Sequence, residues 1–232
     1  MLAIVKACAV IGLDGSIVEV QTDFNPRAGL PSFTIVGLPD NAVKESRERV
    51  RSAIRNSSLQ FVNKAYVINL SPADVLKTGV AYDLAIAVGV LAATDQVPLG
   101  ALESCVFLGE LSLDGSVRHV KGIMPMVYTA VQAGIERAYV PAADAEEAAL
   151  VEGIEIIPVN SLGTLVEHLY GLNPIPPHHA TIAPDDGAIP DGIVDFADVK
   201  GQTFSHLKLK FSIRETIPTS QTPSISVEYL LS

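Results

Sequence analysis

Residues 69–93 contain the side chains that come closest to a catalytic set in this chain. The segment reads NLSPADVLKTGVAYDLAIAVGVLAA and places a hydroxyl at Ser71 and an amine at Lys77 on one polar loop. A hydroxyl becomes a nucleophile when a neighbouring base removes its proton, so this pair is a candidate peptidase dyad. The ordinary interpretation, which we favour, is that Ser71 is a turn residue before Pro72 and that Lys77 is a surface charge.

A carboxylate follows the loop at Asp83, where an apolar stretch from Leu84 to Thr94 begins. The stretch is hydrophobic on nearly every side of a helix, which is typical of a helix in the middle of a protein. A carboxylate at a helix start is favoured by the helix dipole and by the unpaired N–H groups of the first turn. Since no His, Lys or metal partner is visible nearby, we expect Asp83 to cap the helix rather than to act in catalysis.

Basic side chains are concentrated in residues 41–55, NAVKESRERVRSAIR, which contain five basic and two acidic groups. A net charge of −10 argues against a surface that binds nucleic acid everywhere, so any such contact must come from a local patch. Helical spacing aligns four of the basic residues on one side. This row is either a solvated face with local acidic partners or a candidate DNA or subunit interface, and it comprises Lys44, Arg47, Arg51 and Arg55.

Two blocks of the sequence resemble the proteolytic domain of Lon protease. In the first, Lys77 and Gly79 match the Lys and first Gly of the Lon nucleophile loop, and the nucleophile position falls on Ala81. In the second, GELSLDGSVRHVKGIMPMVYTAVQAGIERAYVP at 109–141, the position of the catalytic lysine is Met124. Neither a methyl group nor a thioether can attack a carbonyl or accept a proton. The resemblance therefore implies a Lon-like fold that does not cleave peptides.

Together with the opening 54 residues and the motif DFADVKGQ at 195–202, these blocks resemble the magnesium-chelatase-like AAA+ family of the ComM/YifB type. The resemblance implies a hexameric parent that uses ATP to remodel DNA, by branch migration during natural transformation. The present domain would pack beside its copies and contact DNA or a partner. ATP and Mg are expected only for the AAA+ domain, so we expect no cofactor or metal in this chain and no enzyme activity of its own.

The end of the chain departs from that family. The phosphate-binding loop of an AAA+ domain requires a Gly-Lys pair, and the sequence contains none. Residues 203–232 include ten Ser or Thr and no Gly, Ala, Asp or Asn. We favour the hypothesis that a frameshift or similar break truncates the ATPase domain after Gln202, leaving a disordered tail. The alternative is a genuine segment in which LKLKFSIR forms edge strands.

Alternation and turn residues predict a β-hairpin from Leu2–Ile11 and Ser16–Asp23 around Asp14-Gly15, and a second one around LDGS at 113–116. Asp40 is the predicted N-cap of a helix reaching Arg55. The inward stripe of that helix is predicted to be Val43, Ser46, Val50, Ala53 and Ile54. Further strands are expected at 32–36, 65–70, 137–140 and 154–158, and further helices at 83–94, 123–134, 143–151 and 161–170.

This order of elements predicts an α+β fold with α/β layers, in which mixed sheets pack against helices. The resemblance makes it a Lon-like fold of the ribosomal-protein/GHMP-kinase type. We expect a Lon-like domain at 1–172, a proline-rich linker at 173–195, an AAA+ remnant at 196–202 and the aberrant tail at 203–232. The acidic residues around 142–147 are expected to be exposed surface.

The composition is that of a globular protein, with 48% hydrophobic residues. The apolar run from Leu84 to Thr94 is well short of the roughly 18–20 residues that cross a bilayer, so no membrane span is expected. Cys8 and Cys105 lack metal-ligand spacing and suit core packing in a reducing compartment. We therefore expect a cytoplasmic protein.

Overall fold

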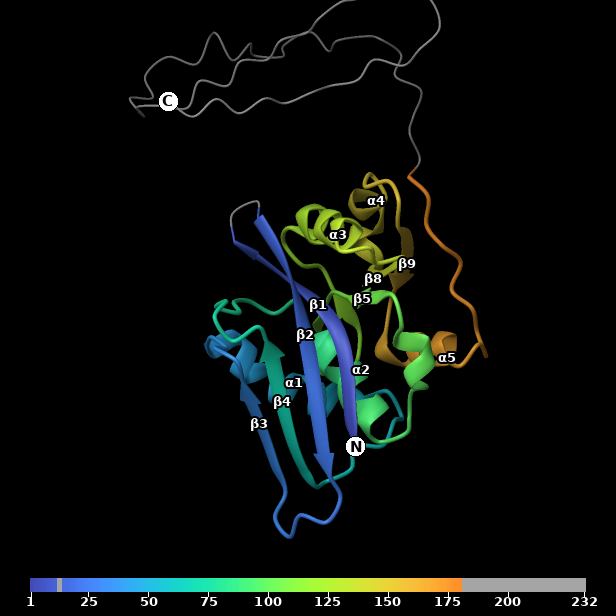
Figure 1. Ribbon diagram of the computed structural model, residues 1–232. Helices are drawn as coiled ribbons and strands as arrows, with labels where there is room; N and C mark the ends of the chain where they lie inside the picture. Colours follow the sequence, from blue (N-terminus) through green and yellow to red (C-terminus); the bar gives the residue numbers. More distant parts are fainter. Residues whose placement is uncertain (12–13, 181–232) are drawn as a thin grey trace, which may run out of the picture. The chain divides into compact units, whose positions relative to one another are not determined.

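A computed structural model describes residues 1–11 and 14–180, in which a seven-stranded sheet has the order β3-β4-β2-β1-β5-β8-β9 (Figure 1). The sheet is mixed. β2 pairs antiparallel with β1 and with β4, whereas β3–β4, β1–β5, β5–β8 and β8–β9 are parallel pairs. Its strands are β1 (Leu2–Ile11), β2 (Asp14–Asn25), β3 (Ser32–Val36), β4 (Ala65–Ser71), β5 (Cys105–Phe107), β8 (Arg137–Pro141) and β9 (Glu155–Val159).

Five α-helices pack on this sheet in the described part of the chain: α1 (Asn41–Asn56), α2 (Asp83–Ala93), α3 (Ile123–Gln132), α4 (Ala145–Ala148) and α5 (Leu162–Leu169). Short 3₁₀ turns occur at Leu99–Leu102 and Ala142–Asp144. Figure 1 shows α1 and α2 behind strands β1 to β4. It shows α3 and α4 near the end of the sheet where β1 finishes and β2 begins. The expected mixed α/β architecture is confirmed.

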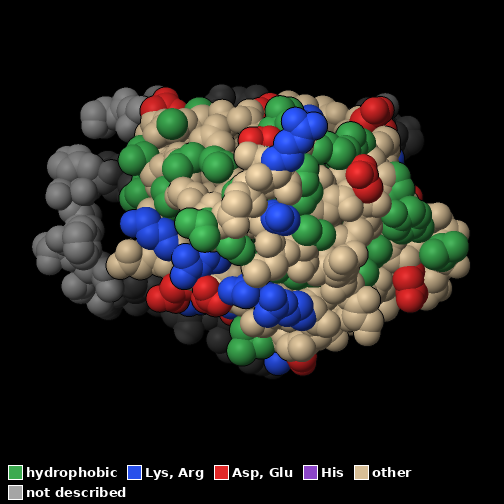
Figure 2. Space-filling model, turned by 90° about the horizontal axis from the view of Figure 1, so that it is seen from below, with side chains coloured by type: hydrophobic (Ala, Val, Ile, Leu, Met, Phe, Trp, Pro, Cys, Tyr) green, Lys and Arg blue, Asp and Glu red, His purple; other side chains and the backbone are tan. Residues whose placement is uncertain are grey.

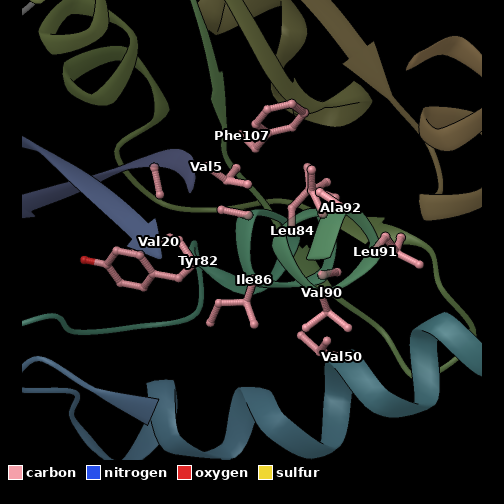
Figure 3. Close-up of a cluster of buried hydrophobic side chains, with 14 of the residues drawn as sticks. Val5, Val20, Val50, Tyr82, Leu84, Ile86, Val90, Leu91, Ala92 and Phe107 are labelled. Atoms are coloured by element: carbon pink, nitrogen blue, oxygen red, sulfur yellow. The ribbon is translucent and has the colours of Figure 1, made fainter. Parts of the chain in front are cut away.

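Helix α2 occupies the centre of the larger apolar cluster, and every one of its residues is buried. Figure 3 shows its side chains packed between Val5 and Val20 of β1 and β2 on one side and Val50 of α1 on another, with Phe107 of β5 close by. An all-round apolar helix is stable only where protein surrounds it. The predicted central position of this helix is therefore confirmed.

The two faces of β1 serve different clusters because side chains alternate along a strand. Val5 and Ala7 face the α2 cluster, whereas Cys8 belongs to a second cluster that includes Ile123 and Val127 of α3. β1 thus contributes to both apolar clusters. Both cysteines are buried and unbridged, as expected.

Helix α1 agrees with its prediction in detail. Asp40 caps it by accepting a hydrogen bond from the Val43 backbone N–H at 2.8 Å, and the predicted inward stripe is buried. The second predicted hairpin is also present, as β6 (Glu110–Leu111) and β7 (Val117–Arg118) joined through the LDGS turn. At that turn Gly115 has φ +87°, a conformation that glycine adopts without strain.

Two local expectations were wrong. Asp14 and Gly15 do not form the turn of the first hairpin, because they belong to β2 and pair with Ile11 and Val10 of β1. The helix expected over residues 143–151 is reduced to the single turn α4, preceded by 3₁₀ geometry. In both cases, nearby residues indicated the correct type of element. The register of the hairpin and the length of the helix depend instead on strand pairing and packing.

The chain after α5 remains attached to the domain as far as His178. The Ile175 N–H donates to His168 Nδ1 at 2.8 Å, and the His178 N–H donates to the Ile156 carbonyl of β9 at 2.8 Å. The first part of the expected linker therefore packs on the sheet. The predictions for the rest of the linker, the AAA+ remnant and the tail concern residues 181–232, which lie outside the described residues. No helix in the described part is long and apolar enough to cross a membrane.

Candidate functional site: a cavity beside α2 and a basic face on α1

A cavity of about 570 Å³ lies at the end of the loop that enters α2. The loop contributes Thr78 to Ala81, and the segment before α3 contributes His119 to Gly122. Apolar side chains such as Cys8 and Met126 also line it, with Glu110 as a carboxylate. The cavity is therefore apolar at several walls and contains a few polar groups, the usual make-up of a ligand pocket.

The two positions that match the Lon dyad have different surroundings. Ala81 lines the cavity and is 7% exposed, so a methyl group stands at the nucleophile position. Met124 lies in the first turn of α3, is 38% exposed and is not among the lining residues, although Gly122 and Met126 are. The Met124 thioether is therefore not part of the cavity wall, and only one of the two Lon dyad positions faces the cavity.

Ser71 and Lys77 do not form a hydrogen-bonded dyad among the described residues. Ser71 ends β4 opposite Glu19, and neither Ser71 nor Lys77 lines the cavity. Lys77 is not the expected surface charge, because its side chain is fully buried and Nζ donates to the Pro72 carbonyl. Burial lowers the Lys77 pKa, and the nearby carboxylate of Asp74 opposes that effect. No hydrogen bond joins Ser71 to Lys77 within the described residues.

The cavity contains polar groups that the sequence did not single out. His119 Nδ1 pairs with Asp144 Oδ1, and Asp144 Oδ2 accepts a hydrogen bond from the Val120 N–H at 3.0 Å. Asp144 is 3% exposed, so the expectation that all acidic residues around 142–147 are exposed was wrong. A buried carboxylate that holds one imidazole nitrogen fixes the ring orientation. His119 and Asp144 are 25 residues apart, and no local pattern predicts their contact.

Asp83 is an internal ion-pair partner and does not cap α2. The N-cap position is Tyr82, which makes no capping side-chain hydrogen bond. Asp83 Oδ2 accepts from Arg49 Nε at 2.6 Å, and Oδ1 accepts from Arg49 Nη2 at 3.0 Å and from Ser46 Oγ. The Leu111 N–H adds a hydrogen bond of 3.2 Å to Oδ2. Asp83 therefore joins α1, α2 and β6, and the bond it accepts from Arg49 raises the pKa of that guanidinium.

The predicted basic row of α1 lies on the side of the helix away from Asp83, and Figure 2 shows Lys and Arg side chains in a band with carboxylates beside them. Lys44, Arg47 and Arg55 are exposed, while Arg51 is half-buried. The guanidinium carbons of Arg51 and Arg55 lie 5.7 and 5.6 Å from the centroid of the Phe61 ring. Both distances are within the range of a cation–π contact.

Arg47 pairs with Glu48 at 2.9 Å, and both side chains are more than half exposed. The solvated-face interpretation thus holds for this one pair. Arg47 and Arg51 also line a second cavity of about 270 Å³, together with Phe61 and Lys64. The structure therefore adds an aromatic ring and a further lysine to the predicted row, from a segment that sequence reasoning did not connect with α1.

Comparison with known proteins identifies the family. Residues 18–144 match the family model described as subunit ChlI of Mg-chelatase. The chain is 38% identical to YifB of Salmonella typhimurium over 203 residues, which are 87% of this chain and 38% of that protein. It is 37% identical to competence protein ComM of Haemophilus influenzae over 175 residues, which are 75% of this chain and 34% of ComM. The chain belongs to the magnesium-chelatase-like ComM/YifB family.

This ComM/YifB-type chain spans less than two fifths of the length of these relatives. An uncharacterized protein of Mycobacterium tuberculosis is 42% identical over 84% of the chain and is matched over 38% of its own length. The likeness to Lon is more distant, with 25% identity to Lon protease 2 of Bacillus subtilis over 72% of the chain. The family membership is therefore shown by the close relatives.

Proposed function

We propose that this chain is a non-catalytic, Lon-like binding and assembly domain of a ComM/YifB-type AAA+ protein. In a family protein that carries both this domain and the AAA+ domain, this domain would pack beside its copies in a hexamer. The hexamer would use ATP to drive DNA branch migration during natural transformation. Its contact with DNA or a partner protein would be made by the basic row of α1. ATP and Mg would be bound by the AAA+ domain and not by this domain.

One observation supports the non-catalytic part above all others, namely that Ala81 presents a methyl group to the cavity at the Lon nucleophile position. Acyl transfer by a dyad requires a hydroxyl or thiol within hydrogen-bond reach of a base. The cysteine among the lining residues, Cys8, is fully buried, and burial raises its pKa to about 11, so it is protonated at neutral pH. A protonated thiol is a poor nucleophile.

The alternative is a Lon-like serine peptidase with a non-standard dyad of Ser71 and Lys77. Lys77 Nζ donates to the Pro72 carbonyl, and no hydrogen bond joins it to the Ser71 hydroxyl among the described residues. A serine-reactive phosphonate probe separates the two functions, because we expect no covalent labelling of the chain. Labelling that disappears in Ser71→Ala would contradict the non-catalytic proposal.

The interface part is tested by measuring DNA affinity across a salt series. Phosphate contacts predict that log K falls linearly with log salt, and loss of one such contact reduces the slope by about 1. We expect Arg47→Glu and Arg51→Glu to weaken binding and to flatten this slope. Arg118→Glu, on the β6–β7 hairpin, makes the same change in net charge and should leave the slope nearly unchanged.

Assembly is measured on the same samples by sedimentation velocity. If the wild-type chain shows no salt-dependent DNA binding but self-associates, the DNA contact is refuted and an assembly role remains. If Arg118→Glu flattens the slope as much as Arg47→Glu, binding depends on overall charge and the assignment to α1 fails.

A further inference from the structure

The second cavity, of about 270 Å³, is formed by three separate segments of the domain, and we call it the Phe61 pocket. Helix α1 contributes Arg47, Glu48 and Arg51, the segment before β4 contributes Phe61 and Lys64, and the start of β3 contributes Phe33. Three basic groups and one carboxylate therefore surround an aromatic surface. That combination favours a ligand with negative charge and a flat ring.

The aromatic floor of the Phe61 pocket is held in place by its surroundings. Gln96 holds Gln60, the residue before Phe61, through two hydrogen bonds. Gln96 Oε1 accepts from the Gln60 N–H at 2.8 Å, and Gln96 Nε2 donates to the Gln60 carbonyl at 2.7 Å. On the other side of Phe61, Tyr66 Oη donates to the Val62 carbonyl at 2.8 Å. The Phe61 ring also packs 5.5 Å from the Tyr66 ring. A pre-formed site loses less entropy when a ligand binds.

The basic groups of the Phe61 pocket have hydrogen-bonding capacity to spare. Arg51 Nε is buried and has no hydrogen-bond partner among the described residues. A buried donor without a partner costs free energy, so a small shift of the Arg51 side chain toward a ligand acceptor would be favoured. Glu48, the one carboxylate of the lining, is bound to Arg47 in an exposed pair of the kind that contributes little. Lys64 also lines the pocket as a third cation.

We infer that the Phe61 pocket binds one nucleotide of a single-stranded nucleic acid. A base would stack on the Arg51 guanidinium, which itself lies 5.7 Å from the centroid of the Phe61 ring and is supported by it, while the flanking phosphates would contact Arg47 and Lys64. Single-strand sites combine a positive groove with aromatic stacking platforms in this way. The volume lies just below the usual range of about 300–1,000 Å³ for ligand pockets, which suits one nucleotide unit and no more.

Single strands are favoured over duplex because bases in a duplex are stacked inside it and cannot reach a ring on the protein surface. Duplex DNA can contact only the exposed cations of the α1 row through its phosphates. This inference rests on the proposed nucleic-acid contact of α1 and adds the form of nucleic acid and the residue that selects it.

The test measures the affinity of the full chain for a fluorescein-labelled 20-nucleotide oligo(dT) and for a duplex of the same length, by anisotropy at one fixed salt concentration. We expect the wild-type chain to bind the single strand more tightly. Phe61→Leu keeps an apolar side chain but removes the ring, and should weaken single-strand binding roughly ten-fold while leaving duplex binding unchanged.

Phe24→Leu is the matched control. Phe24 belongs to the same aromatic cluster, with its ring 5.0 Å from that of Tyr66, but it does not line the Phe61 pocket. Equal unfolding free energies of the two variants would show that their folded states are comparable, and Phe24→Leu should bind both oligonucleotides as the wild type does. If Phe61→Leu unfolds, Lys64→Gln replaces it, with an expected loss of single-strand binding.

The outcomes separate this inference from the proposed function. If single-strand and duplex affinities fall together in Phe61→Leu, or neither changes, the nucleotide pocket is refuted while the salt-dependent contact of α1 stands. If thymidine monophosphate displaces the oligonucleotide at equal concentration of nucleotide units, the pocket is a mononucleotide site and the inference fails. If neither oligonucleotide binds the wild type, the DNA contact itself is refuted.

Discussion

Removal of the Asp83 carboxylate should be among the most destabilising single changes in this domain. Asp83 is fully buried and accepts hydrogen bonds from Arg49, Ser46 and the Leu111 N–H. Asp83→Ala removes the acceptor that these groups share and deprives the Arg49 guanidinium of its closest counter-charge. Breaking a buried ion pair from one side typically costs about 3–5 kcal/mol. The Arg49 side chain is 18% exposed and can regain some water, so we expect about 3 kcal/mol.

The measurement is urea unfolding at pH 7, with the denaturant slope compared between variants to establish that the unfolded states match. Glu45→Gln is the matched control, because Glu45 also faces Arg49 but lies 3.9 Å away and is 75% exposed. An exposed pair at this spacing contributes at most about 0.5 kcal/mol. Asp83→Asn should fall between the two, since an amide oxygen still accepts from Ser46 Oγ but carries no charge.

The reasoning is refuted if Asp83→Ala lies within about 1 kcal/mol of the wild type, the ordinary size of a substitution without a special mechanism. It is also refuted if Glu45→Gln costs as much as Asp83→Ala. In either case the pair would be a solvated contact, and the link between α1 and α2 would depend on apolar packing alone.

Three further results are expected. Gly37→Ala should cost about 1–3 kcal/mol more than Gly79→Ala in urea unfolding, because both glycines have positive φ but only at Gly37 would a Cβ overlap a backbone carbonyl; equal losses would contradict this. Burial and Arg137 lower the pKa of His168 below 6.5, so the unfolded chain binds the proton first and stability present above pH 6.5 is lost as the pH falls. The protection factor of the Ile175 amide, which donates to His168 Nδ1, should therefore fall as the pH falls below 6.5, and a pH-independent protection factor would refute this. Burial raises the pKa of Cys8 from 9.0 to about 11, so the unfolded chain loses this proton first and stability should fall from pH 9 to 11 by up to about 1.4 kcal/mol per pH unit. Cys8→Ala should have a shallower slope over this pH range, and an unchanged slope would exclude the thiol as its cause.

The elements that sequence reasoning predicted correctly are those whose signal is local. The N-cap at Asp40 and the buried stripe of α1 follow from helical periodicity, which depends on residues one turn apart. The central position of α2 follows from its apolar composition, because a helix that faces water carries polar side chains on its outer side. The β6–β7 hairpin follows from a four-residue turn. None of these features requires knowledge of a distant partner.

The misassigned charged residues share the opposite property. Asp83, Lys77 and Asp144 were each expected to cap a helix or to face water, and each is buried. Asp83 and Asp144 are paired with groups 34 and 25 residues away. A buried charge is tolerated only when paired and hydrogen-bonded. Such partners come from other elements of the fold, so hydropathy and spacing along the chain could not reveal them.

Helix α1 combines both kinds of signal, and this determines which part of the candidate interface the sequence could reveal. Its outer row is a property of spacing, so the four basic residues were found as one set, namely Lys44, Arg47, Arg51 and Arg55. Its inner face holds Arg49 against Asp83, which fixes the helix beside α2 and so fixes the direction of the outer row. Phe61 lies in a segment that joins this row only through tertiary packing. If the Asp83–Arg49 pair sets the orientation of α1, Asp83→Asn should weaken single-strand binding as well as stability, although Asp83 lines neither cavity.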